Sequence, residues 1–186
     1  MVEDRIGYRY AKSIFDLAKE KNMLEDVHAD MAYIHEVCMT SPDFVRVLES
    51  PIINEGKKNS ILKEVVGKHM QSDMTKLLTD QIVRKGRERY LDNMAKAFVQ
   101  LYDLEKHISH AVLTSATPLT DDQVSKIKAQ LAKQTGDTID LVVKVDESLL
   151  GGFVLKLGDQ LFDGSVASGL RKLRQEFGDS SFERKY

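Results

Sequence analysis

The sequence predicts a mainly α-helical protein, in which an N-terminal antiparallel bundle of about six helices precedes a small α/β module. In the first hundred residues, apolar side chains recur at i, i+3, i+4 and i+7, the spacing of helices with one buried face. Near residue 108 the period changes, and short alternating strands appear beside two further helical stripes. We therefore expect domains at residues 1–108 and 109–178, followed by a polar, disordered tail at 179–186.

Each predicted helix of the bundle carries an apolar stripe that ends at a short polar joint. The joints Ser41-Pro42 and Ser50-Pro51 are typical of helix boundaries, because proline cannot continue a preceding helix. Short joints favour antiparallel packing of consecutive helices. The stripes lie at Asp4–Lys21, Leu24–Cys38, Phe44–Leu48, Ile61–Val66, Met74–Ile82 and Tyr90–Leu104.

The α/β module begins with a short predicted strand from His110 to Ala116. Thr120 and Gln123 have the spacing of a capping box and predict the start of a helix. Gly136 stands where a glycine typically ends such a helix.

Two more strands and a helix complete the module. Ile139–Val145 and Phe153–Leu157 alternate between apolar and other residues, and Gly158-Asp159 suits a tight hairpin turn. Asp163 or Ser165 is the expected cap of the last helix. Its apolar stripe consists of Val166, Leu170, Leu173 and Phe177.

Composition narrows the function and the compartment. The chain has 27 Lys and Arg against 29 Asp and Glu, a formal net charge of −2, which argues against binding a nucleic-acid backbone. Cys38 is the single cysteine, so no internal disulfide is possible, which fits a reducing compartment. The acidic start differs from a signal peptide, and no stretch approaches the roughly 20 apolar residues of a membrane span. We expect a cytoplasmic protein whose membrane contact runs through a partner.

The glycine-rich segment Leu149–Ser165 holds four of the eleven glycines. A phosphate-binding loop needs the pattern G-x-x-x-x-G-K-[ST], but Gly152 and Gly158 have the wrong spacing and Asp159 follows in place of lysine. The dinucleotide fingerprint G-x-G-x-x-G is also missing. We expect these glycines to serve tight turns and close backbone packing.

No catalytic motif stands out, so we expect neither an enzyme nor a bound cofactor or metal. Cys38 lies on an apolar stripe, typical of a buried structural thiol. Asp103, His107 and His110 have i, i+4, i+7 spacing, so a small metal-dependent enzyme stays open as an alternative. The charged run Arg84–Arg89 is read as a helix junction that could meet an acidic partner.

The first helix has a wide apolar face. Its apolar and aromatic positions cover an arc of roughly 200°, whereas a helix lying on one core needs about 100°. Two neighbours are therefore needed to cover it. Either sibling helices wrap it inside the bundle, or a groove on it binds a partner's amphipathic helix. A stand-alone helical adaptor would have the same groove.

Three parts of the chain resemble the delta subunit of bacterial F-type ATP synthases, a relative of the mitochondrial oligomycin-sensitivity-conferring protein. Tyr10–Ala18 is similar to the family's opening Tyr-Ala-Lys-Ala-Leu-Phe helix, with Ser13-Ile14 in place of Ala-Leu. The most specific part is Ile139–Gly158, where the family signature is matched at every constrained position. The third part holds the middle landmarks Leu48–Ile53, Lys57-Lys58 and Gly86-Arg87, where Arg84-Lys85 departs from a usual Glu-Asn. The match of the signature continues through Asp163–Val166 to Leu170 in the last helix.

The resemblance implies a non-catalytic stator that links the catalytic head to the peripheral stalk at the cytoplasmic face of the bacterial inner membrane. It implies that the N-terminal helix of an alpha subunit binds between the first and fifth helices, and that the C-terminal module binds the C-terminal region of the stalk's b subunits. The residues expected to bind the alpha helix are Tyr10, Ala11, Ile14, Leu17, Leu77, Leu78, Gln81 and Ile82.

Overall fold

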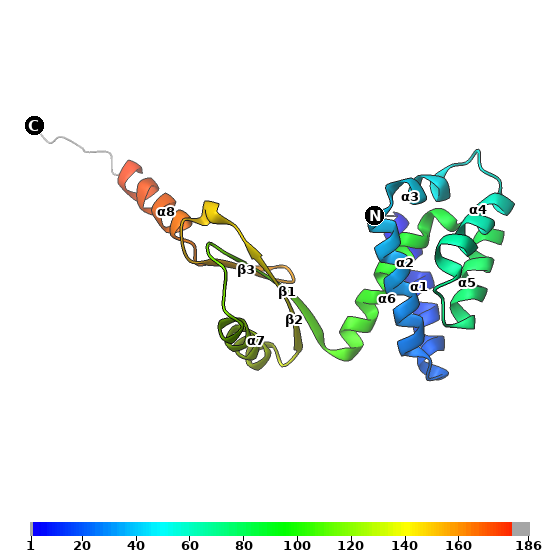
Figure 1. Ribbon diagram of the computed structural model, residues 1–186, viewed down its shortest axis with the longest axis horizontal. Helices are drawn as coiled ribbons and strands as arrows, with labels where there is room; N and C mark the ends of the chain where they lie inside the picture. Colours follow the sequence, from blue (N-terminus) through cyan, green and yellow to red (C-terminus); the bar gives the residue numbers. More distant parts are fainter. Residues whose placement is uncertain (1, 180–186) are drawn as a thin grey trace, which may run out of the picture. The chain divides into compact units, whose positions relative to one another are not determined.

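The computed structural model describes residues 2–179, and contacts divide the chain into one unit ending at Glu105 and another beginning at Lys106 (Figure 1). This division lies three residues before the boundary expected at 108. Of the expected tail 179–186, Asp179 is the last residue of a helix, and the rest lies outside the described residues.

The first unit is a helical bundle, and the predicted mainly α-helical fold is confirmed. Within the described residues it contains six α-helices, the number expected from the apolar stripes. They are α1 (Val2–Glu20), α2 (Leu24–Thr40), α3 (Pro42–Glu49), α4 (Glu55–Leu62), α5 (Asp73–Arg84) and α6 (Leu91–Lys106). A π-helical turn (Lys63–Gly67) follows α4, and the 3-10 turn η2 (Glu88–Tyr90) precedes α6.

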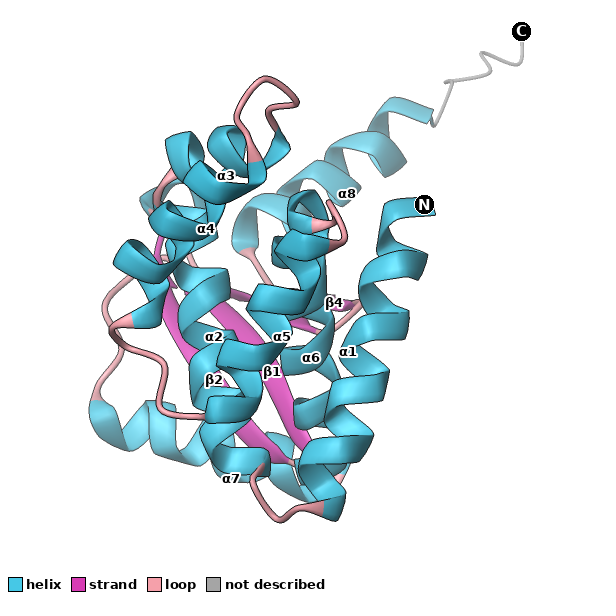
Figure 2. Ribbon diagram, turned by 90° about the vertical axis from the view of Figure 1, so that its right-hand side faces the viewer, coloured by secondary structure: helices cyan, strands magenta, loops and turns pink. Residues whose placement is uncertain are grey.

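Helices α1 and α6 pack closely and run in the same direction (Figure 2). Near their N-terminal ends, a Cβ placed on Gly7 would lie 2.8 Å from Cβ of Asn93, so the approach requires glycine. Further along, the rings of Phe15 and Phe98 meet edge to face with centroids 5.8 Å apart. This contact covers much of the apolar arc predicted on the first helix.

A buried carboxylate joins α2 to the start of α5. Asp30 accepts hydrogen bonds from the backbone N–H groups of Gln71 and Ser72 at 2.8 and 2.9 Å. Ser72 is the N-cap of α5, and its own side chain accepts from the Met74 N–H. These bonds give the buried carboxylate its donors, and they give the backbone N–H groups at the start of α5 their acceptors. They therefore fix where α5 begins.

The second unit is a four-stranded sheet with two helices. The strand order is β2-β1-β3-β4, with β1 parallel to β2 and antiparallel to β3. The parallel pair is connected through α7, as a parallel connection requires. The elements are β1 (Ile108–Ser115), α7 (Asp121–Thr135), β2 (Thr138–Val145), β3 (Phe153–Leu157), β4 (Gln160–Asp163) and α8 (Val166–Asp179).

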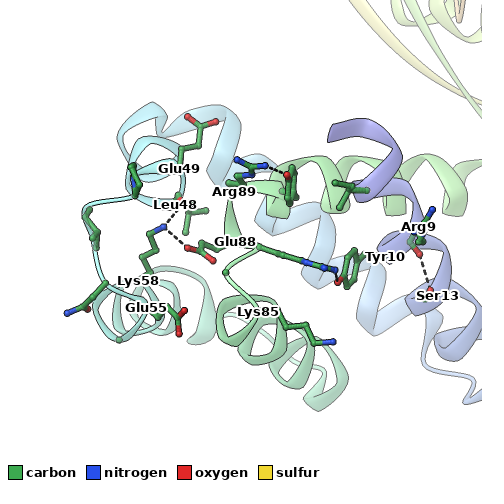
Figure 3. Close-up of a pocket in the computed structure, with 18 residues that line it drawn as sticks. Arg9, Tyr10, Ser13, Leu48, Glu49, Glu55, Lys58, Lys85, Glu88 and Arg89 are labelled. Atoms are coloured by element: carbon green, nitrogen blue, oxygen red, sulfur yellow. Dashed lines mark hydrogen bonds and ion pairs between the residues drawn. The ribbon is translucent and has the colours of Figure 1, made fainter. Parts of the chain in front are cut away.

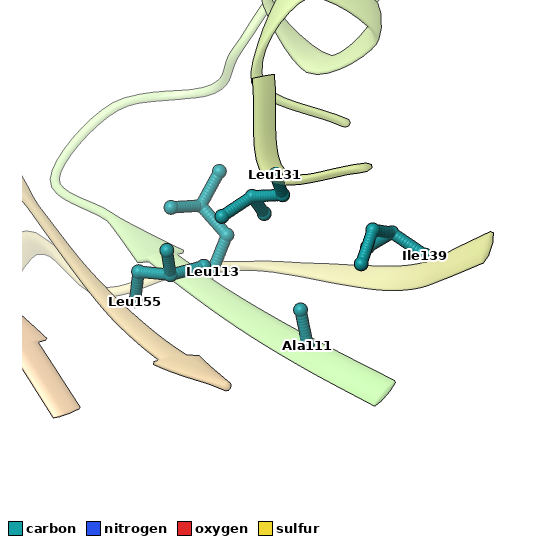
Figure 4. Close-up of a cluster of buried hydrophobic side chains, with 5 residues drawn as sticks. All are labelled: Ala111, Leu113, Leu131, Ile139 and Leu155. Carbon is teal, nitrogen blue, oxygen red and sulfur yellow. The ribbon is translucent and has the colours of Figure 1, made fainter. Parts of the chain in front are cut away.

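A small apolar core lies between α7 and one face of the sheet (Figure 4). Leu131 of α7 meets four side chains from β1, β2 and β3, and those of β2 and β3 belong to the alternating apolar sets of the sequence. The buried members are Ala111, Leu113, Leu131, Ile139 and Leu155. The alternating pattern of the sequence therefore identified the covered face, although Val145 and Phe153 at the strand ends stay exposed.

The predicted helix and turn signals of this unit are present. Thr120 and Gln123 form the capping box of α7, and Gly136 ends that helix with φ of +78°. Both candidate caps of α8 contribute, since Asp163 accepts from the Ser165 N–H and Ser165 accepts from the Ser168 N–H. The hydrogen bond from the backbone N–H of Ser165 is the main reason why the pKa of Asp163 is lowered, because it favours the charged carboxylate.

Gly152 shows why the glycine-rich segment is structural. Its φ is +78°, and a Cβ there would lie 2.2 Å from the carbonyl oxygen of Gly164. The N–H of Val166 donates to the Gly151 carbonyl at 2.9 Å, so this turn is also tied to the start of α8. Glycine is needed here for both backbone conformation and close approach.

We expect Gly152→Ala to destabilise the second unit more than Gly136→Ala does. Both glycines have φ of +78°, but a Cβ on Gly136 meets nothing within 4 Å. Gly136→Ala should cost about 1 kcal/mol for the left-handed backbone alone. Gly152→Ala should cost about 3 kcal/mol because the clash is added. Urea unfolding of both variants measures the difference, and equal losses would contradict the steric role of Gly152.

Candidate partner-binding site

The structure separates the predicted partner-binding residues of α1 by burial. Ala11 and Ile14 are buried in the bundle, with 2% and 8% of their surfaces exposed. Tyr10 is half-buried, and Leu17 is 39% exposed. The sibling helices thus cover Ala11 and Ile14, which the sequence also allowed as an explanation of the wide apolar arc.

The α5 residues divide in the same way. Ile82 is buried inside the bundle, Leu78 is half-buried, and Gln81 is exposed. Leu77 is 67% exposed, although it is a large aliphatic side chain. The predicted residues that still present surface are Tyr10, Leu17, Leu77, Leu78 and Gln81, which we call the α1–α5 surface.

A pocket of about 1200 Å³ opens beside Tyr10 (Figure 3). Its wall is formed by α1, the α3–α4 connection, the start of α4, and the turn from α5 into η2. Tyr10 is the one predicted partner-binding residue that lines it. The charged side chains around it are Arg9, Glu49, Glu55, Lys58, Lys85, Arg87, Glu88 and Arg89.

Tyr10 joins α1 to the turn after α5. Nη1 of Arg87 donates a hydrogen bond to the Tyr10 hydroxyl, and the guanidinium carbon lies 5.6 Å from the centre of the tyrosine ring. The second distance is that of a cation–π contact. This pair places the C-terminal end of α5 beside the middle of α1.

A buried ion pair forms the floor of the pocket (Figure 3). Nζ of Lys58 donates to Oε1 of Glu88 at 2.5 Å and to the Leu48 carbonyl at 2.8 Å. Both side chains are less than a tenth exposed. Oε2 of Glu88 is buried and has no hydrogen-bond partner in the described structure. Such a pair is costly to break because each charge has left water.

Breaking the pair from one side should be worse than removing it whole. We expect Lys58→Met to lower the free energy of unfolding by about 3 kcal/mol, because Glu88 is left charged and buried. The double variant Lys58→Met with Glu88→Leu should recover most of that loss. Denaturant unfolding of the singles and the double tests this, and simple additivity of the two losses would refute the coupling.

The candidate catalytic and metal residues do not assemble into a site. Cys38 is buried, and burial raises the pKa of its thiol to about 12, so the nucleophilic thiolate is scarce near neutrality. Asp103 lies on α6, but His110 lies on β1 beside Asp140, so the predicted shared helical face is wrong. Over residues 2–179, no group of three or more His, Cys, Asp or Glu side chains is placed to hold a metal.

Sequence reasoning singled out only part of the pocket. The run Arg84–Arg89 was identified as charged and as a helix junction, and it supplies one wall. Lys58 belongs to a family landmark and Glu88 to this charged run, but their pairing gave no signal because they are 30 positions apart and each looks like a surface residue. Among the described helices, none is long and apolar enough to cross a membrane.

Comparison with known proteins identifies the family. The family model of the ATP synthase delta (OSCP) subunit matches residues 6–177. The ATP synthase subunit delta of Cytophaga hutchinsonii is 37% identical over 177 residues, covering 95% of this chain and 96% of that protein. The corresponding subunit of Lactobacillus johnsonii is 36% identical over 174 residues, with 93% and 94% covered.

A solved structure agrees with this assignment. One chain in the cryo-EM structure of the Toxoplasma gondii mitochondrial ATP synthase hexamer matches with a TM-score of 0.70 and 26% identity. The match covers 92% of this chain and 96% of that one. Because the family model and the relatives span nearly the whole length, the chain belongs to the ATP synthase delta (OSCP) subunit family.

Proposed function

We propose that this chain is a non-catalytic stator subunit of an F-type ATP synthase that links the catalytic head to the peripheral stalk. The observation that carries the proposal is the family match across residues 6–177, which includes both units of the chain. Each unit also exposes apolar side chains suited to one of the two attachments.

The first unit would hold the head through an alpha-subunit N-terminal helix. Leu17 and Leu77 leave aliphatic surface in water, and an amphipathic helix would bury it. Tyr10 adds an aromatic side chain that is already held in place by Arg87. Ala11, Ile14 and Ile82 would support this surface from below, because their side chains fill the bundle interior.

The second unit would hold the stalk through the C-terminal region of the b subunits. Val166, Leu170 and Leu173 follow one another at i, i+4 and i+7 on α8. All three are about half exposed, so α8 carries an apolar stripe that its own unit leaves partly uncovered. An exposed apolar stripe on a helix is best covered by another helix, so we expect a helical partner.

The role is mechanical. Rotation inside the head exerts torque on the stator, and a subunit attached at both ends resists it without bond-making chemistry. Buried apolar helix contacts suit this task because they slow dissociation. In related complexes, a gain in affinity appears mostly as a lower dissociation rate. The chain would sit at the cytoplasmic face of the bacterial inner membrane, attached through the complex.

Replacing the exposed leucines should abolish partner binding without unfolding the chain. We expect Leu17→Asp and Leu77→Asp each to weaken binding of an alpha-subunit N-terminal peptide by at least about tenfold, because a carboxylate replaces buried apolar contact. Isothermal titration of the full chain measures the affinity. Met39→Asp is the control, since Met39 is 71% exposed, close to the 67% of Leu77, but lies at the end of α2.

The outcomes separate the stator from the adaptor alternative. Retained circular dichroism together with lost peptide binding supports a docking surface. No heat with the wild-type chain would overturn the alpha-subunit assignment and favour a stand-alone adaptor with another partner.

A further inference from the structure

We propose that the outer edge of β2 pairs with the same edge of a second copy of this chain, forming an antiparallel dimer centred on Val142. This inference goes beyond the proposed function. The proposed stator attachments use the α1–α5 surface and the stripe of α8, and neither of these includes β2.

β2 lies at one end of the sheet and presents a long, regular edge (Figure 1). Its eight residues pair with β1 in one unbroken parallel register. The strand contains no proline and its register no bulge, so two common devices that protect a sheet edge are missing here. β4, at the other end of the sheet, is only four residues long. β2 is therefore the edge of this sheet best suited to pair with another strand.

The pairing with β1 determines which backbone groups of β2 face outward. Thr138 donates its N–H to the His107 carbonyl, and Asp146 donates to the Ser115 carbonyl, both at 2.8 Å. Because backbone groups point alternately to the two sides of a strand, the even-numbered residues face β1. The residues whose N–H and C=O groups face the outer edge are the odd-numbered ones, Ile139, Leu141, Val143 and Val145.

The side chains along this edge are only partly provided for within the chain. Val142 and Val145 are 48% and 52% exposed. Lys144 is exposed, and within residues 2–179 it forms no ion pair. Asp140 meets His110 through Oδ2 at 3.1 Å, but its side chain is 61% exposed, so a second cation can still reach it. A strand that pairs here would cover valine side chains and could give both charges a partner.

The order of these residues makes the strand complementary to itself. In an antiparallel pair centred on Val142, Asp140 of each copy lies opposite Lys144 of the other. These even-numbered pairs are the non-hydrogen-bonded ones, in which opposite side chains approach most closely. On the other face of the sheet, Leu141 of each copy lies opposite Val143 of the other, and these residues exchange backbone hydrogen bonds.

Other registers of the same strands lose this match. A centre at Asp140 or at Lys144 would set two like charges directly opposite each other, which destabilises a strand pair. A centre at Leu141 sets Asp140 opposite Val142, and a centre at Val143 sets it opposite Asp146. Charge therefore selects one register. Because this two-fold pairing uses the outer edge of β2 in both copies, the assembly closes as a dimer.

Charge reversal in the full chain tests the pairing. Sedimentation velocity over a range of chain concentrations measures the dissociation constant of the dimer. We expect Lys144→Asp and Asp140→Lys each to raise this constant at least about tenfold, because each variant sets like charges opposite each other at both symmetric positions. An equimolar mixture of the two variants should dimerise again, since the facing charges are then opposite in sign. Lys156→Asp is the matched control, because Lys156 is an exposed lysine of β3, which does not border the outer edge.

Amide hydrogen exchange distinguishes this edge from any other contact between copies. The N–H groups of Leu141 and Val143 should become protected as the chain concentration rises. Those of Val142 and Lys144 face β1 and should stay protected at every concentration.

Three results would each overturn the inference. The first is a wild-type chain that stays monomeric at concentrations up to about 1 mM, where even a weak dimer is populated. The second is an effect of Lys144→Asp no larger than that of Lys156→Asp, and the third is a mixture of the two charge variants that stays monomeric. None of them bears on the titration with the alpha-subunit peptide, so the stator proposal is tested separately.

Discussion

The close packing of α1 on α6 decides what the first unit can offer to a partner. Gly7 allows the helices to approach beside Asn93, and Phe15 meets Phe98 further along. This contact covers much of the apolar arc of α1, which is wider than a single neighbouring helix can cover. On α1, the large apolar side chains that stay exposed are Tyr8 and Leu17, and the proposed docking surface combines Leu17 with the exposed Leu77 of α5. The proposed docking surface is thus a by-product of how the core is closed.

The second unit also leaves apolar surface uncovered, because its core is small. Its core is a single cluster under α7, and the turn at Gly152 connects the sheet to α8 through backbone contacts that leave no room for a side chain. The stripe of α8 follows this turn and is not consumed by the core, since Leu170 and Leu173 stay about half exposed. Two units that each retain apolar surface fit a subunit that must be held at both ends.

Much of the fold could be predicted from the sequence because local signals determine it. Helical periodicity identified the bundle, and Thr120, Gln123 and Gly136 marked both ends of α7. The site was less predictable, because a wide apolar arc indicates how many neighbours a helix needs but not whether they come from the same chain. Ala11 and Ile14 are covered from within for that reason. Lys58 and Glu88 meet only through tertiary packing, and no local pattern distinguishes them from surface charges.

The central claim is that the surface left open by the α1–α6 packing binds the head. Methyl NMR of the full chain with and without the alpha-subunit peptide tests it most directly. The account predicts that the methyl signals of Leu17 and Leu77 shift and show contacts to the peptide, while those of Leu104, an exposed leucine near the end of α6, and of Leu170 on α8 stay in place. Unchanged Leu17 and Leu77 signals in a sample that binds the peptide would contradict it.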